Sequence, residues 1–239
     1  MGKLWVFGDS NSALYTDTTM MLQDWVKPYV NYLGYEPKHF SQALAEKLNL
    51  ELKNYGMGGS DNYTIFETMF YQIKNFNKED DVIFIGVTDA SRFRVAITTP
   101  DACYFRSITA GGHNDDLPIS KDTIHEILAN RMNPLFSKEF ENYINLIKMA
   151  LNGYKIYFWT AFDPLREAKG VINLMKLGYL YKMGNITNIA QETNGQINDG
   201  HFGEKGNLLL SELFYKFINE TRVPYIRDIY NETRIIKFV

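Results

Sequence analysis

The sequence predicts an α/β fold of three layers, in which helices cover both faces of a parallel sheet. Short apolar runs of strand length alternate with amphipathic helical patterns along most of the chain, and this alternation is typical of parallel sheets. The 239 residues, 45% of them hydrophobic, are enough to build one large core. No internal repeat and no low-complexity linker divides the chain, so we expect a single domain over 1–239.

Four apolar segments are expected to form the strands of the sheet. The first, 4–7, ends at Gly8, and the second and third, 50–55 and 81–85, also run into glycine-containing turns. The fourth strand is expected over 154–160. Because ligands of such sheets bind at the carboxyl ends of the strands, the turns after them are the first candidates for a functional site.

Helical patterns occupy the intervals between these strands. One helix is expected over 37–48 and another over 61–76. A third is expected to start with Ser137 as its N-cap and to end before Gly153, and a fourth to cover 208–218. The second of these helices carries an apolar stripe made of Ile65, Met69, Phe70 and Ile73.

Other stretches lack a clear pattern. The residues 15–35 are expected to be irregular and to rim the site. The segment 98–136 is expected to be an insertion at the carboxyl edge of the sheet; it is either a lid or partner-binding arm, or a peripheral structural insert. The segment 163–197 mixes glycines and prolines with apolar residues and is equally ambiguous. Finally, 224–239 alternates apolar and polar residues, as would a strand or hairpin that contacts another subunit.

A serine follows the first predicted strand directly. The apolar run breaks into Gly8, Asp9 and Ser10, which places Ser10 on a tight turn at the carboxyl end of the strand. This position suits a nucleophile. A serine hydroxyl needs a base, a group that orients the base, and donors for the developing oxyanion, so the rest of the chain must supply these.

The best candidate for the base is His201, in a loop before the last helical pattern. Asp199 lies two residues before it and Asn198 three residues before it, so a group that fixes the imidazole tautomer is close in sequence. The other histidines have weaker settings. His39, for example, lies in an amphipathic helical pattern, where a packed or surface role is more common.

Two further turns are candidates for the oxyanion donors. The second strand is followed by a glycine-rich turn that includes Gly59, and the third by a turn that contains Thr88. A backbone N–H from the first turn and a side-chain donor from the second can converge with the N–H of Ser10 on one substrate oxygen. Three strand ends would then build one site.

These blocks, in this order, resemble the SGNH (GDSL-type) hydrolase family. Gly8-Asp9-Ser10 matches the nucleophile block of that family, and Asn54-x-Gly56-x-x-Gly59 is similar to its second block. The resemblance spans nearly the whole chain. It implies a flavodoxin-like strand order, Ser10 as the nucleophile, and backbone oxyanion donors at Ser10 and Gly59.

The chain departs from the family pattern at two functional positions. Thr88 stands where the family usually has an asparagine of the oxyanion hole; its hydroxyl can also donate, but from a shorter side chain. In the last block, Asn198 stands where the family has the aspartate three residues before His201. Either Asp199 orients His201 from a tighter loop, which we prefer, or Asn198 does so as a neutral partner, or a water mediates. Candidate supporting residues are Asp9, Asn198 and Asn62.

The motifs do not favour a cofactor. The glycine-rich turn at 56–59 does not follow the first strand, as a dinucleotide-binding fingerprint would, and the sequence has no phosphate-binding loop motif. The four histidines and the single Cys103 lack the spacing of metal ligands. A net charge of -3 without a basic cluster gives no reason to expect a nucleic-acid partner.

The sequence also bears on where the protein works. No apolar run is long enough to cross a membrane, and no signal-like segment precedes the first strand, so we expect no membrane partner and a cytoplasmic location. A single cysteine agrees with a reducing compartment. The abundance of Asn, Lys, Tyr and Ile suits a bacterium or a bacteriophage; a phage protein would be virion-associated or released on lysis.

The resemblance implies a serine esterase that forms an acyl-enzyme. The expected substrate is a small-molecule or polysaccharide ester, and the preferred one an O-acetyl group on a carbohydrate, since 15% of the residues are aromatic and such rings stack on sugars. Thioesters, lipid esters and acyl transfer stay open. The alternative, from a different class, is a weakly active or inactive SGNH-like binding or assembly protein, such as a component of a bacteriophage virion.

Overall fold

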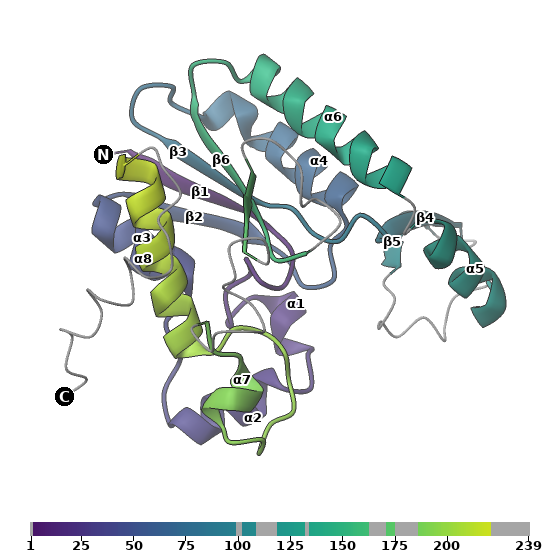
Figure 1. The fold of residues 1–239 in the computed structure, drawn as a ribbon, viewed down its shortest axis with the longest axis horizontal. Helices are drawn as coiled ribbons and strands as arrows, with labels where there is room; N and C mark the ends of the chain where they lie inside the picture. The colour runs from purple at the N-terminus through teal and green to yellow at the C-terminus, as the bar shows by residue number, and fades with distance from the viewer. Residues whose placement is uncertain are drawn as a thin grey trace.

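The predicted α/β architecture is confirmed by a computed structural model, which describes residues 2–98, 102–108, 119–131, 134–162, 171–174 and 186–220. Five parallel strands form one sheet in the order β2-β1-β3-β6-β7 (Figure 1). Counted along this sheet alone, that is the flavodoxin-like order 2-1-3-4-5. The strands are β1 (Lys3–Gly8), β2 (Glu51–Gly56), β3 (Val82–Gly86), β6 (Lys155–Thr160) and β7 (Val171–Asn173).

Helices cover both faces of the sheet because successive strand side chains point to opposite sides. In β1, Leu4 and Val6 pack into a core with α3 (Phe40–Leu48) and α8 (Glu204–Glu220). The intervening Trp5 and Phe7 pack into a second core with α4 and α6 on the other face. Figure 1 shows these two pairs of helices on opposite sides of the strands. Helix α4 spans Asn62–Gln72, and α6 spans Pro134–Ala150.

Smaller elements surround the carboxyl ends of the strands. Three short helices, α1 (Thr18–Met21), α2 (Val26–Leu33) and α7 (Ile189–Glu192), lie at one end of this edge, and η1 (Ile73–Asn75) extends α4. An antiparallel hairpin of β4 (Phe93–Thr98) and β5 (Cys103–Ile108) follows β3. It packs with α5 (Lys121–Arg131) around the buried residues Phe93, Ile97, Ile108, Ile124 and Leu128.

The expectation of an irregular segment over 15–35 was wrong, because it contains α1 and α2. Pro28 suggested an interruption, but it is the third residue of α2. In the first turn of a helix the N–H groups have no intrahelical acceptor, so a proline there costs no hydrogen bond. Gly34 ends α2 in the left-handed conformation, with φ 78°.

Other parts of the structure also differ from expectation. Helix α6 begins at Pro134 rather than after Ser137, because proline suits the first position of a helix. The stretch 98–136 is not simply irregular: β5 and α5 occupy much of its described part. The stretch 163–197 contains β7 and α7 in its described part, and the strand or hairpin expected over 224–239 lies outside the described residues.

No helix in the described part of the chain is both long and apolar enough to cross a membrane.

Candidate active site

The candidate site lies where β1, β2 and β3 end. These strands finish at Gly8, Gly56 and Gly86, and the turn after β1 folds back so that Ser12 packs against all three glycines. A side chain at any of them would collide with Ser12. The close approach of three backbones explains why glycine ends each strand, and it places Ser10 at the centre of the carboxyl edge.

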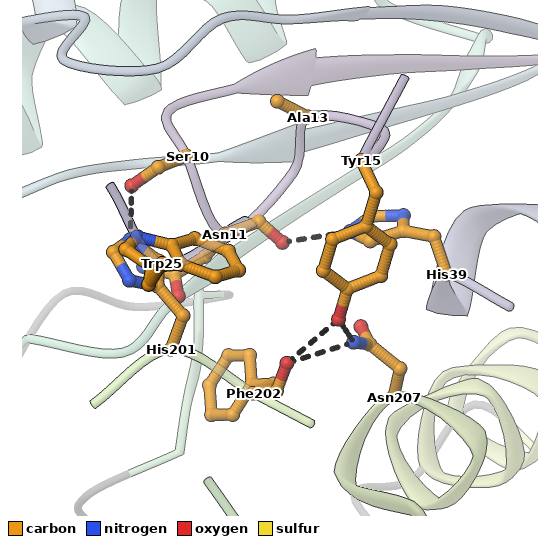
Figure 2. A pocket seen from close by; sticks show the side chains of 9 residues that line it. All are labelled: Ser10, Asn11, Ala13, Tyr15, Trp25, His39, His201, Phe202 and Asn207. Atoms are coloured by element: carbon orange, nitrogen blue, oxygen red, sulfur yellow. Dashed lines mark hydrogen bonds between the residues drawn. The ribbon is translucent and has the colours of Figure 1, made fainter. Parts of the chain in front are cut away.

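Ser10, His201 and Asp199 form a continuous chain of hydrogen bonds. The Oγ of Ser10 lies 2.8 Å from Nε2 of His201 (Figure 2). Nδ1 of His201 lies 2.8 Å from Oδ1 of Asp199, and the same oxygen accepts a hydrogen bond of 2.8 Å from the backbone N–H of His201. With the Nδ1 proton directed at the carboxylate, Nε2 is left to accept the proton of the serine.

The loop that carries His201 is attached to the first turn of α7. The N–H of Ile189 donates to the carbonyl of His201 at 2.9 Å, and the N–H of Ala190 donates to the carbonyl of Asp199 at 3.0 Å. The first N–H groups of a helix have no acceptor within the helix, so this loop satisfies them while the helix fixes the loop. Helix α7 therefore sets the positions of both the base and its carboxylate.

Asn198 differs from Asp199 in its surroundings. Its side chain is exposed and has no hydrogen-bond partner in the described part of the chain. Of the two residues that the sequence offered as partners of His201, the structure brings only Asp199 to the imidazole.

Sequence reasoning placed 15–35 at the rim of the site but did not predict that Trp25 contacts the base. Its indole ring stacks on the imidazole of His201, with 4.7 Å between ring centroids and an angle of 23° between planes. Figure 2 shows the two rings overlapping beside Ser10. Trp25 comes from the start of α2, and nothing in its sequence neighbourhood signals the contact. The stacked indole covers one face of the imidazole with an apolar surface.

His39 lies beneath the nucleophile turn. Its Nε2 is 3.2 Å from the carbonyl of Asn11, and its Nδ1 is 2.8 Å from Oγ of Ser41. Burial lowers the pKa of His39 to about 4, so the ring is neutral and acts as a hydrogen-bonding support for the residue after Ser10.

Two backbone N–H groups are available for an oxyanion. Within the described residues, neither the N–H of Ser10 nor that of Gly59 has a hydrogen-bond acceptor. The two turns are neighbours because β1 and β2 pair in register up to Gly8 and Gly56. Gly59 has φ 79° and open space where a side chain would project, which leaves its peptide accessible.

The side chain of Thr88 is engaged elsewhere, which differs from the role expected of it. Thr88 is fully buried, and its hydroxyl donates to Oδ2 of Asp9 at 2.7 Å. The hydroxyl has one proton, so that proton is directed at Asp9 rather than at a substrate. The short threonine side chain ends beside a buried carboxylate that needs donors, which accounts for the difference.

The supporting candidates Asp9 and Asn62 are both buried and bind the backbone of the turns after β1 and β3. The carboxylate of Asp9 also accepts the N–H of Asn11 at 3.0 Å. Asn62 makes two hydrogen bonds with the backbone of Thr88: it accepts from the N–H at 2.8 Å and donates to the carbonyl at 3.0 Å. These bonds fix the turn after β3 to the start of α4.

A small pocket opens beside the triad. Its cavity volume is about 10 Å³, which is room for about one water molecule. In the described part of the chain, no three His, Cys, Asp or Glu side chains gather in a way that could hold a metal ion. The pocket is lined by Ser10, Asn11, Ala13, Tyr15, Trp25, His39, His201, Phe202 and Asn207 (Figure 2).

Comparison with known proteins gives a distant similarity. The sequence matches no protein-family profile and no curated protein. Among solved structures, the chain is similar to one from Desulfitobacterium hafniense DCB-2 that was assigned to the G-D-S-L family of lipolytic proteins, with 10% identity and a TM-score of 0.40. The match covers 89% of this chain and 97% of that chain. At this level the similarity does not assign the chain to a family, and the function must be inferred from the site itself.

Proposed function

We propose that the protein is a serine hydrolase that cleaves an ester through an acyl-enzyme intermediate. The observation that carries this proposal is the chain of two 2.8 Å contacts from Oγ of Ser10 through His201 to Asp199. The same three residues were singled out from the sequence: Ser10 and His201 in blocks that resemble those of SGNH hydrolases, and Asp199 as the preferred partner of His201 although it departs from the family pattern. A nucleophile, a base and an orienting carboxylate in this geometry are the minimum set for acyl transfer.

Each group has a defined part in the reaction. His201 takes the proton of Ser10 as Oγ attacks the ester carbonyl, and then gives it to the leaving alcohol. Asp199 holds the imidazole and stabilises its cation. In the second half, a water loses a proton to His201 as it attacks the acyl carbon, and His201 returns that proton to Oγ of Ser10 as the acyl–oxygen bond breaks and the acid leaves.

The oxyanion of both tetrahedral intermediates needs preorganised donors. The unpaired N–H groups of Ser10 and Gly59 serve here, from the ends of neighbouring strands. We assign Thr88 a supporting part, because its hydroxyl binds Asp9 directly beside the nucleophile.

As the substrate we propose an ester of a small acyl group, with an O-acetylated carbohydrate as the preferred candidate. The cavity beside Ser10 is too small to enclose a long acyl chain, and this supports a short acyl group. The exposed ring of Tyr104 in the β4–β5 hairpin is the kind of surface on which a sugar stacks. Comparing turnover of p-nitrophenyl acetate with that of longer acyl esters, and acetate release from an acetylated polysaccharide, tests this choice.

A fluorophosphonate probe tests the reaction class. It should form a covalent adduct on the folded protein, and peptide mass spectrometry should place the adduct on Ser10. His201→Ala should react far more slowly, because the serine then has no base. If the folded wild-type protein does not react, the site is not a serine hydrolase, and a binding or assembly role becomes the better account.

A further inference from the structure

A partly buried arginine links the two turns that carry the proposed oxyanion donors. Arg92 lies just before β4, and its Nη1 is 3.2 Å from Oδ2 of Asp9 and 3.2 Å from the carbonyl of Ser60. The Arg92 side chain is 17% exposed and that of Asp9 5%. The guanidinium also lies over the ring of Phe162, with 5.5 Å to the centroid.

Both contacts of Arg92 are made to residues next to the proposed oxyanion donors. Asp9 directly precedes Ser10, and Ser60 directly follows Gly59. One guanidinium nitrogen therefore bridges the two peptide segments whose N–H groups face the proposed oxyanion. A shift of either turn would change the separation of those donors, and misplacement by about 1 Å can cost about a hundredfold in rate.

Arg92 also changes the electrostatics of the turn. Asp9 is a buried carboxylate one residue from Ser10, so its negative charge would oppose a developing oxyanion. Within the described residues, Arg92 is the only cationic side chain that contacts Asp9, and Thr88 adds a neutral donor. The arginine thus offsets a charge that works against the reaction.

We propose that Arg92 is a positioning residue of the oxyanion hole, which holds the turns of Ser10 and Gly59 together and neutralises Asp9. This inference rests on the proposed hydrolase function. The hydroxyl of Thr88 in the third turn is directed at Asp9 and does not supply a third oxyanion donor. Arg92 compensates by holding the two backbone donors in place.

A matched control is available two residues further along the chain, in β4. Arg94 forms an ion pair of 2.6 Å with Glu67 on the surface, and its guanidinium packs over Phe105 at 4.5 Å. Arg94→Ala therefore removes an arginine of β4 and its contacts without touching either turn. A general effect of weakening the hairpin would appear in both variants, and an effect on the oxyanion hole only in Arg92 variants.

The experiment compares wild type, Arg92→Ala, Arg92→Lys and Arg94→Ala by turnover of p-nitrophenyl acetate, inhibition by phenylboronic acid, and rate of fluorophosphonate labelling. Phenylboronic acid forms a tetrahedral adduct with the serine that mimics the intermediate. In Arg92→Ala, kcat and boronate affinity should fall together by about 10- to 100-fold with KM little changed. Methylguanidinium in solution should restore part of the kcat. Arg94→Ala should behave as wild type.

The outcomes separate the two proposals. Wild-type labelling at Ser10 together with wild-type kcat and boronate affinity in Arg92→Ala would overturn the role of Arg92 and leave the hydrolase intact. Equal losses in Arg92→Ala and Arg94→Ala would also overturn it. If Arg92→Ala does not fold, Arg92→Lys decides: its ammonium is one bond nearer the backbone than Nη1 and cannot keep both 3.2 Å contacts unless a turn moves, so wild-type kinetics and boronate affinity there would contradict the brace. No labelling of the wild type would overturn the hydrolase, and with it this role.

Discussion

Among the individual residues, Asp199 and Asn198 give the sharpest contrast. They are adjacent in sequence, yet one carboxylate oxygen of Asp199 accepts both the ring and the backbone N–H of His201, whereas Asn198 is exposed. A carboxylate in this position fixes the tautomer of the base and stabilises its cation during the reaction. Only one of the two side chains can therefore matter for turnover.

We expect Asp199→Asn to lower kcat by roughly 100- to 10,000-fold, because the amide can donate to the imidazole and favour the wrong tautomer. Asn198→Ala should leave kcat near that of the wild type. Steady-state kinetics with p-nitrophenyl acetate measures both. A severe loss in Asn198→Ala with near-normal turnover in Asp199→Asn would reverse the assignment.

His39 predicts how stability depends on pH. Burial lowers its pKa from 6.5 to about 4, so between these values the unfolded chain binds a proton that the folded chain does not. Stability is therefore full above about pH 6.5 and falls as the pH drops toward 4, by on the order of 3 kcal/mol in total. Urea unfolding at several pH values should show a shallower loss in His39→Gln, which has no titrating ring. An identical pH dependence in both proteins would show that this histidine does not carry the effect.

At the scale of elements, α7 is held by a network around Glu192. One oxygen of this carboxylate accepts the hydroxyl of Tyr29 in α2 at 2.8 Å, and the other accepts the hydroxyl of Thr187 at 2.6 Å and the N–H of Gly206 in α8 at 3.2 Å. The network ties α2 and α8 to the helix whose first N–H groups bind the loop of His201. Through α2 it is also connected to the element that supplies Trp25.

Removing the carboxylate of Glu192 should weaken the hold of α7 on the His201 loop, although Glu192 does not contact His201 directly. We expect Glu192→Ala to lower the free energy of unfolding by about 2–3 kcal/mol, because several donors lose a charged acceptor, and to reduce turnover. Glu192→Gln, which retains one acceptor oxygen, should lose less in both respects. Thermal unfolding and kinetics check this together. A Glu192→Ala protein with wild-type stability would contradict the structural part assigned to the network.

The β4–β5 hairpin is also tied to the site in its described part. The hydroxyl of Ser107 in β5 donates to Asp61, the N-cap of α4, which follows the turn of Gly59. Arg92 adds the contacts to Asp9 and Ser60. These bonds connect the hairpin region to the turns that follow β1 and β2.

For the whole molecule, the sequence was sufficient for four of the five strands of the sheet and for the residue types of the site. Local signals, namely short strand-like runs bounded by turns, predicted β1, β2, β3 and β6, whereas β7 was not predicted. Ser10, Asp199 and His201 were identifiable from short motifs, and their catalytic roles remain predictions that their geometry supports. The first and last parts of the chain meet only through the fold: Ser10 and His201 are 191 positions apart.

The features that sequence reasoning missed depend on contacts between distant segments. Thr88 was expected to face a substrate, but it lies against Asp9, 79 positions away. The stacking of Trp25 on His201 and the bridge made by Arg92 have no local sequence signal, because each joins elements that only the parallel sheet brings together. The presence of α2 and the start of α6 were misjudged for another reason. Each helix has a proline in its first turn, where proline does not break a helix.

The central claim is that Ser10 is the nucleophile of an ester hydrolase, and the turnover of p-nitrophenyl acetate by Ser10→Ala tests it most directly. We predict a loss of at least about a thousandfold relative to the wild type, since removing a triad nucleophile costs several orders of magnitude. The melting temperature should change little, because the lost hydroxyl is only partly buried and its single side-chain contact is with His201. Wild-type turnover in a folded Ser10→Ala protein would contradict the account.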